Sequence, residues 1–395
     1  MMYCKKCVYP LKAVNLSVDE EGICSSCRAF ENSANITNSE WKLREKKFEE
    51  IINTVKKNNN KSNYDCLIPV SGGKDSYYQT HIMAKKYGLK PLLMTYHGNN
   101  FLPEGDRNRD NMRHVFDADH IVWGPSIETL KKLNRLAFKK MGDMNWQNHC
   151  GIKTAPIRLA CNFNIPLIIW GEINWDISGM FDPNDYAEFS AKTRHEHDLR
   201  GYEWYDFLND KDDNIREIDM NWAKYPSDLE IIKVGIRGIY IGNYFKWDPN
   251  WHTELVKNEY SWKGASNDFQ RTYRKMSNLD DRYENGVHDL LKFIKFGYGR
   301  CSDHASKDIR TGYITREEGI EYVKKYDHVV SDDLYHWLDY VDMDEQEFWK
   351  IADTFRDPAV WWIENNEWCK NNIWGSYSSY GEVHLDKNLR KKYER

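Results

Sequence analysis

Residues 69–76 have the side chains and the spacing of a phosphate-binding turn. They read Pro-Val-Ser-Gly-Gly-Lys-Asp-Ser, follow the apolar run 66–68 and precede a helix-like pattern that begins near Tyr77. A turn between a strand and a helix presents unpaired backbone N–H groups and the positive end of the helix dipole, and both attract an anion. Glycines let the backbone approach that anion, while serine hydroxyls and a lysine add donors and charge. The segment therefore predicts phosphate binding, against the alternative of a Gly-Gly turn that only links two elements.

Asp75 is the unexpected member of this segment. Its carboxylate repels phosphate unless a cation such as Mg²⁺ lies between them. A Walker A loop has a glycine six positions before its lysine and a serine or threonine after it, but this chain has Ile68 and Asp75 at those positions. The stretch instead resembles the SGGxDS signature of the N-type ATP pyrophosphatases. The resemblance implies an enzyme that binds ATP, transfers AMP and releases pyrophosphate.

Each residue of the loop has an expected role in that chemistry. Lys74 is the predicted cationic clamp on the leaving pyrophosphate, and Asp75 is a predicted magnesium contact. The residues expected to hold the pyrophosphate itself are Ser71, Gly72, Gly73 and Ser76.

A second polar turn, residues 171–176, follows the apolar run 166–170 and reads Gly-Glu-Ile-Asn-Trp-Asp. Glu172 and Asp176 could hold Mg²⁺ against phosphate oxygens, and Asn174 could hydrogen-bond the substrate. The alternative is an ordinary strand-to-helix turn with an N-cap. Because ligands bind beyond the carboxyl ends of parallel strands, Thr95 and Gly171 are expected to line one crevice with the SGGKDS loop.

Basic side chains gather further along the chain. His288, Lys292 and Lys295 have the i, i+4, i+7 spacing of one helix edge, and more cations follow in a glycine-containing bend. Such a cluster suits an anionic group such as a nucleotide-sugar phosphate or a carboxylate, whereas the alternative is a solvated side of a core helix. The predicted substrate-binding residues are Lys292, Lys295, Arg300, His304 and Arg310. Residues 195–198, His-Glu-His-Asp, are expected to form a solvated charged loop.

Four cysteines near the start of the chain form two CxxC pairs, Cys4 with Cys7 and Cys24 with Cys27, separated by sixteen residues. This is the spacing of a zinc ribbon, in which four thiolates close a tetrahedral structural site. Disulfides or a redox CxxC are the alternatives, but the chain shows neither a secretory signal nor a strand-CxxC-helix pattern. We therefore predict bound Zn²⁺ that folds a short segment.

Short apolar runs alternate with amphipathic segments between residues 64 and 170. Strands are expected at 65–70, 91–96, 120–123 and 166–170, with helices at 75–87, 107–116, 127–141 and 154–162. This alternation predicts an α/β fold with a doubly wound parallel sheet. A further strand is expected within 231–240. The expected domains are a zinc ribbon (1–35), a connecting helix and linker (36–62), an ATP pyrophosphatase domain (63–250) and a mainly helical substrate or partner region (251–395).

Composition restricts the class of protein. The 395 residues carry a net charge of -5, which argues against a general nucleic-acid binder. No apolar run approaches the ~20 residues that span a bilayer, and the start of the chain lacks a signal-peptide core, so we expect a cytoplasmic protein without membrane insertion.

Several segments together resemble one family. The CxxC pairs, SGGKDS, GEIN, YFKWDP, HDLLKFIKFGYGRCSDHASKDIR and GYITREEGIEYVKKYD are similar to the N-acetyl sugar amidotransferases of bacterial surface-polysaccharide synthesis, of the lipopolysaccharide O-antigen and pseudaminic or legionaminic acid type. The resemblance extends over nearly the full length. It implies an adenine nucleotide alpha hydrolase-like fold and conversion of an acetamido group on a nucleotide-activated sugar to an acetamidino group, with ATP, Mg²⁺ and ammonia.

The source of ammonia is predicted from the cysteines. A glutaminase needs a nucleophilic cysteine at the mature N-terminus or on a sharp turn with a histidine. Cys4 is assigned to zinc and Cys301 lacks a small-residue elbow. We therefore expect ammonia from a partner, and the resemblance implies a glutaminase with a cyclase-like subunit. Homo-oligomerisation is left open. The alternatives are a tRNA-modifying ATP pyrophosphatase of the thiolation or lysidine type, with Cys150 and Cys161 as candidate cysteines, and a non-enzymatic zinc-ribbon scaffold.

Overall fold

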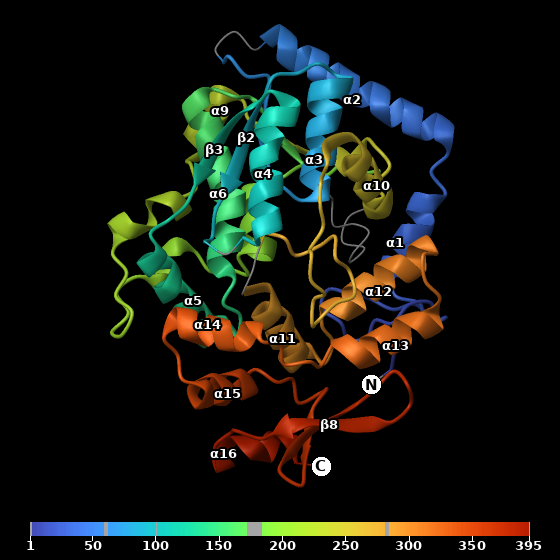
Figure 1. Cartoon of the computed structure of the whole chain (residues 1–395), viewed down its shortest axis with the longest axis vertical. Coiled ribbons are helices and arrows are strands. Elements are labelled where there is room, and N and C mark those ends of the chain that lie inside the picture. Colours follow the sequence, from blue (N-terminus) through green and yellow to red (C-terminus); the bar gives the residue numbers. More distant parts are fainter. Residues whose placement is uncertain (1, 59–61, 100, 172–183, 281–283, 395) are drawn as a thin grey trace.

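A five-stranded parallel sheet organises the first two thirds of the chain, with strand order β3-β2-β1-β4-β5 (Figure 1). The computed structural model describes residues 2–58, 62–99, 101–171, 184–280 and 284–394. Leu67 of the central strand pairs with Leu92 on one side and Ile168 on the other. The strands are β1 (Cys66–Pro69), β2 (Pro91–Tyr96), β3 (Asp119–Trp123), β4 (Leu167–Trp170) and β5 (Arg237–Tyr240). The predicted doubly wound α/β fold is confirmed.

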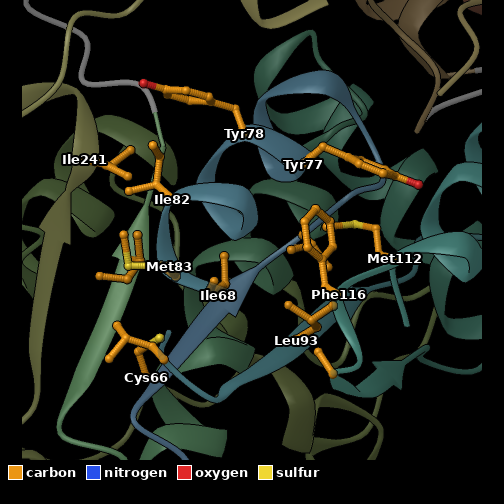
Figure 2. Close-up of a cluster of buried hydrophobic side chains, with 14 of the residues drawn as sticks. Cys66, Ile68, Tyr77, Tyr78, Ile82, Met83, Leu93, Met112, Phe116 and Ile241 are labelled. Atoms are coloured by element: carbon orange, nitrogen blue, oxygen red, sulfur yellow. The ribbon is translucent and has the colours of Figure 1, made fainter. Parts of the chain in front are cut away.

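Helices cover both faces because consecutive strand residues point in opposite directions. Ile68 and Leu93 face one cluster, which includes Tyr77 and Phe116, as Figure 2 shows. Leu67 and Leu92 face the other cluster. The helices around the sheet are α2 (Asn38–Asn58), α3 (Lys74–Thr80) with its π-helical continuation η1 (His81–Lys86), α4 (Pro103–Phe116), α5 (Ile127–Met141), α6 (Trp146–Phe163), α9 (Asp228–Val234) and α10 (Pro249–Tyr260).

The strand predicted within residues 231–240 is only half correct. Its first part is the end of α9, and β5 begins at Arg237. The helix begins with a capping box in which Ser227 and Glu230 exchange side-chain and backbone hydrogen bonds, and Gly235 ends it at φ +74°. The apolar, β-branched run was therefore divided between two elements by its caps.

Between β4 and α10 the chain forms short helical elements. The segment 195–198, expected as a solvated loop, is part of a π-helix and is only partly exposed. These elements are α8 (Ala191–Thr193), η2 (Arg194–Asp198), η3 (Trp204–Phe207), η4 (Glu217–Ala223) and η5 (Ile241–Asn243).

The C-terminal region is mainly helical, as predicted, and lies below the parallel sheet in the view of Figure 1. The bend expected at residues 300–310 is instead helix α12, because Gly299 stands at its N-cap and Gly312, at φ +77°, ends it. A small antiparallel sheet was not predicted. The elements are α11 (Glu284–Phe296), α12 (Arg300–Thr311), α13 (Arg316–Tyr326), α14 (Asp333–Val341), α15 (Glu345–Thr354), β6 (Trp362–Glu364), β7 (Glu367–Asn371), β8 (Tyr377–Glu382), α16 (Lys387–Arg390) and η6 (Lys391–Tyr393).

The cysteine-rich N-terminal segment does not stand apart as a separate module. It runs into α1 (Ser25–Ala34), which carries Cys27, and it packs beside α12 and α13, where the dark blue chain runs in Figure 1. The Tyr9 hydroxyl donates to Asp303 Oδ1 at 2.9 Å, and the Arg316 guanidinium donates to the Cys7 carbonyl at 3.2 Å. The expected domain boundaries stay a prediction. Among the described residues, no helix combines the length and apolarity needed to cross a membrane.

Candidate functional site

The SGGKDS loop leaves the carboxyl end of β1 and enters α3. Gly72 has φ +80°, and a Cβ there would lie 2.6 Å from the backbone nitrogen of Arg109, so only glycine fits. The Ser71 N–H donates to Ser76 Oγ at 3.0 Å, and the Gly73 N–H lies 3.3 Å from Ser71 Oγ. Gly73 is the N-cap of α3, which has no side-chain cap. The first N–H groups of the helix therefore have no capping side chain, and this leaves them available to an anion.

Lys74, which is buried, and Asp75, which is partly exposed, form a charged group with a histidine of α10. Lys74 Nζ donates to Asp75 Oδ2 at 2.7 Å, and His252 Nδ1 lies 3.0 Å from Asp75 Oδ1. Burial alone would raise the pKa of Asp75, but the Lys74 charge and the His252 hydrogen bond outweigh burial and hold this pKa well below its usual value. Asp75 is therefore an anion at any physiological pH, as a magnesium ligand must be.

A crevice of about 340 Å³ opens beyond the carboxyl ends of β1, β2 and β4. It brings Ser71, Ser76 and Gly171 together, as expected for an ATP site. A Cβ at Gly171 would lie 2.0 Å from Gln79 Nε2, so the absence of a side chain there keeps this wall intact. Asp280 also lines the crevice. Desolvation by the surrounding protein raises its pKa, although Ser71 and Lys74 oppose the shift.

Thr95 does not line this crevice. It is 1% exposed, and its hydroxyl donates to the Val70 carbonyl at 2.6 Å and lies 2.8 Å from His120 Nε2. The side chain thus links β2 to the residue before the SGGKDS loop. Its predicted contact with ATP stays a prediction, and the geometry favours an indirect role in holding the loop.

A larger cavity of about 760 Å³ also reaches the loop and is called the acceptor cavity below. Lys74 and Asp75 line it together with four of the five predicted substrate residues, Lys292, Lys295, Arg300 and His304. Residues 14–16 of the cysteine-rich segment form part of its wall. Segments from both ends of the chain therefore enclose a space that reaches the phosphate loop.

The basic residues of the acceptor cavity are already oriented by protein partners. Lys292 Nζ donates to Asp303 Oδ2 at 2.5 Å, and Arg300 Nε donates to Asp289 Oδ1 at 2.9 Å. His304 Nδ1 lies 2.6 Å from Thr272 Oγ1. Burial lowers the pKa of His304 well below its usual value, with Arg274 and Arg300 adding to the shift, so this residue is a neutral hydrogen-bonding group and not a cation.

Arg310 stands apart from the other four. It lines a separate pocket of about 300 Å³ between α1, α10 and α12, with its guanidinium 6.0 Å from the Tyr9 ring centre. Arg274 and Lys307 line both this pocket and the acceptor cavity. The predicted contact between Arg310 and substrate stays a prediction without support from this arrangement.

The sequence did not predict several residues that line the acceptor cavity. Glu196, His197 and Asp198 of η2 line the acceptor cavity, and so do Asp143 and His149. The charged run at 195–198 was visible in the sequence, but nothing in its spacing placed it near the loop. Glu172, Asn174 and Asp176, predicted to contact Mg²⁺ or substrate, lie outside the described residues.

The four cysteine thiols have the geometry of a metal site. Their sulfur atoms all lie within 4.8 Å of one another, and all four residues are buried. Cys4 Sγ is 4.0 Å from Cys27 Sγ, and Cys7 Sγ is 3.7 Å from Cys24 Sγ. A tetrahedron with Zn–S bonds of about 2.3 Å requires sulfur separations of about 3.8 Å. The cluster therefore fits the predicted zinc.

Part of the C-terminal region is similar to a known family. Residues 268–374 match the family model described as "LPS biosynthesis protein WbpG-like, C-terminal domain". Within the C-terminal region, this segment is therefore similar to the WbpG-like domain. The match spans all five predicted substrate residues and supports the sequence-based assignment to surface-polysaccharide enzymes. No curated protein matches the chain significantly.

Solved structures were also compared with the whole chain. The NMN synthetase from Francisella tularensis is 12% identical, and the match covers 56% of this chain and 97% of that chain with a TM-score of 0.27. A likeness of this strength does not identify an activity. The WbpG-like region and the geometry of the two cavities are the stronger guides.

Proposed function

We propose that the chain is an ATP-dependent amidotransferase of lipopolysaccharide biosynthesis that converts an acetamido group of a nucleotide-activated sugar into an acetamidino group. The observation that carries the proposal is the shared cavity: Lys74 and Asp75 of the phosphate loop face the same space as Lys292, Lys295 and Arg300 of the WbpG-like region. A nucleotide site and an anion-binding acceptor site that meet at the loop suit transfer of AMP to the acceptor.

The proposed reaction begins with activation of the amide. An amide carbonyl is a poor electrophile, so its oxygen attacks the α-phosphorus of ATP, and an O-adenylyl imidate and pyrophosphate form. Lys74 and the N–H groups of the loop stabilise the charge that develops on the leaving pyrophosphate. Asp75 would hold Mg²⁺, which neutralises phosphate charge when bound. Ammonia then displaces AMP and gives the acetamidino group.

Four of the five cysteines outside the N-terminal cluster support an external source of ammonia. Burial raises the pKa of Cys66, Cys161 and Cys301, and it raises the pKa of Cys150 to about 11. None of these four thiols is a thiolate near neutral pH, which a glutaminase nucleophile must be. We therefore propose that a partner glutaminase with a cyclase-like subunit supplies ammonia, and that ammonium salts replace this partner in vitro.

A tRNA-modifying enzyme is the main alternative. Cys150 and Cys161 both lie on α6, eleven positions apart (161 minus 150), which is about 16 Å along a helix and too far for a catalytic pair. A nucleotide-binding scaffold without activity is the other alternative. Pyrophosphate release that depends on tRNA and not on any nucleotide sugar would support the first, and ATP binding without turnover would support the second.

Mass spectrometry gives the direct test of the proposal. Candidate diacetamido nucleotide sugars are incubated with ATP, Mg²⁺ and ammonium, and the products are analysed. Exchange of O for NH lowers the acceptor mass by about one unit, and AMP and pyrophosphate appear in equal amounts. Turnover of ATP with an unchanged acceptor mass across such a panel contradicts the proposal.

The affinity for an anionic acceptor is expected to depend on the charge of Lys295. Burial lowers the pKa of this lysine from 10.5 to about 8, with Arg200 adding to the shift and Asp143 opposing it. Raising the pH from 7 to 9 therefore removes the charge, and the acceptor KM should rise several-fold. Lys295→Arg, which stays charged, should flatten this profile.

Loss of stability cannot produce the same profile. Because the pKa of Lys295 is lower in the folded chain, the unfolded chain binds more protons between pH 8 and 10.5, and this group's contribution to stability increases as the pH rises. The control is the KM for ATP, measured at the same pH values. The Lys295→Arg change should leave this KM unchanged. An acceptor KM that rises equally in the wild type and in Lys295→Arg contradicts the prediction.

A further inference from the structure

The crevice beyond β1, β2 and β4, where we propose that ATP binds, is called the ATP crevice here. His149 is the one described residue that lines both the ATP crevice and the acceptor cavity. It lies in the first turn of α6, where its backbone N–H donates to the Asn145 carbonyl at 3.2 Å. Asn145 and Asn148 of the same turn line the crevice, whereas Asp143 just before the helix lines the acceptor cavity. The imidazole therefore stands at the junction of the two spaces.

The ring of His149 offers an unused polar atom at this junction. Its Nε2 is buried and has no hydrogen-bond partner within the described part of the chain. Two other histidines of the acceptor cavity are engaged, since His288 Nδ1 lies 2.9 Å from Asp143 Oδ1 and His304 Nδ1 lies 2.6 Å from Thr272 Oγ1. A buried polar atom without a partner costs free energy, so a site that keeps one is expected to pair it with a ligand.

The surroundings of His149 keep its ring neutral before ligands bind. Burial lowers its pKa to about 3, Arg200, His288 and Lys153 add to the shift, and Asp143 opposes it. A neutral imidazole can accept a proton, unlike the lysines and arginines of the acceptor cavity. Phosphate charge bound in the crevice would raise this pKa towards the working pH, because an anion favours the imidazolium.

We infer that His149 accepts a proton from ammonia as ammonia attacks the adenylated acceptor. The inference rests on the proposed function and assigns a residue to its second step. The nitrogen lone pair forms the new C–N bond, and the C–O bond to AMP breaks, its electron pair leaving on the AMP phosphate. The acceptor nitrogen keeps its own hydrogen throughout, so the adenylated acceptor reacts as the N-protonated imidate. Ammonia brings three N–H bonds, and the amidinium product keeps two on that nitrogen. The third proton goes to Nε2 and then to solvent or to departing AMP.

Separate assays of the two steps test the inference. Acceptor-dependent exchange of pyrophosphate into ATP reports adenylation, and mass spectrometry reports the acetamidino product. His149→Gln and His149→Ala should keep the exchange rate within about threefold of the wild type, while ammonia-dependent product formation falls by about 10²- to 10⁴-fold, as for loss of a general base. Hydroxylamine should restore much of the lost rate, because it is a stronger nucleophile whose adduct gives up a proton more readily.

The control is His81→Gln. His81 is also half-buried with a lowered pKa, but it lies on η1 against the Tyr260 hydroxyl and lines neither cavity. This variant should retain both steps. If the His149 variants lose exchange and product formation in parallel, or keep product formation, the inference is wrong although the proposed function stands. If the wild type catalyses no acceptor-dependent exchange with any nucleotide sugar, the proposed function fails and the inference fails with it.

Discussion

Replacing Lys74 by alanine should lower kcat for AMP and pyrophosphate release by about 10²- to 10³-fold, with a much smaller change in the acceptor KM. The expected loss is that of one preorganised charge which acts on the leaving group in the transition state. Lys74 is 8% exposed and points its ammonium at the Asp75 carboxylate, so it is held in place before ATP arrives. Steady-state release of both products gives the measurement.

The matched control for Lys74→Ala is Lys85→Met. Lys85 is an exposed lysine of the same helical segment and lies outside both cavities. It should behave like the wild type. Thermal unfolding of both variants checks that the fold is retained. Equal activity of Lys74→Ala and the wild type would show that the loop takes no part in the reaction. It would favour a role of the protein as a nucleotide-binding scaffold.

Asp75→Asn tests the predicted contact of Asp75 with Mg²⁺ at the same site. The asparagine can still meet His252, but it removes the negative charge that would hold Mg²⁺. We expect the Mg²⁺ concentration for half-maximal rate to rise by about 10- to 100-fold. An unchanged magnesium dependence together with a reduced rate would instead mean that Asp75 serves only to orient Lys74, the other group it contacts.

Removing one ligand of the cysteine cluster is the second change with a large expected effect. Cys24→Ser should abolish binding of one zinc per chain, measured by elemental analysis, and should lower the thermal unfolding temperature. It should also raise the acceptor KM at least about tenfold. Metal binding organises the N-terminal segment, and residues 14–16 of that segment line the acceptor cavity. The affinity for ATP should change little, because no cluster residue lines the crevice among the described residues.

Cys161→Ser is the matched control for the cluster variant. Cys161 is a half-buried cysteine near the end of α6, away from the cluster. Its zinc content and acceptor KM should equal those of the wild type. A Cys24→Ser protein that has lost its zinc yet binds the acceptor normally would show that the ribbon has no part in forming the cavity.

The parts of the molecule that the sequence predicted well depend on local physics. The strand, glycine turn and helix at residues 66–80 follow from neighbouring residues, and so does the side of α11 that presents Lys292 and Lys295. The cysteine cluster follows from spacing alone. Each of these signals is complete within a short stretch of chain, so no knowledge of tertiary packing is needed to interpret it.

The sequence was least informative where packing or a cap determines which space a side chain reaches. Thr95 lies at the carboxyl end of β2, as predicted. Its hydroxyl, however, contacts the Val70 carbonyl and the His120 ring. Arg310 shares α12 with Arg300, yet it lies at the opposite end of the helix and reaches a different pocket. His149 was missed because α6 begins at Trp146, eight residues before its expected start (154 minus 146).

Contacts between the two ends of the chain also affect how the protein is made. Tyr9 and Asp303 are 294 positions apart, and Cys7 and Arg316 are 309 apart. During synthesis the N-terminal segment therefore waits about 15–60 s for these partners, because chains emerge at only about 5–20 residues per second. Until α12 and α13 have emerged, the N-terminal segment lacks the helices against which it packs, and the crevice is also incomplete until Asp280 and Asn285, which line it, have been added.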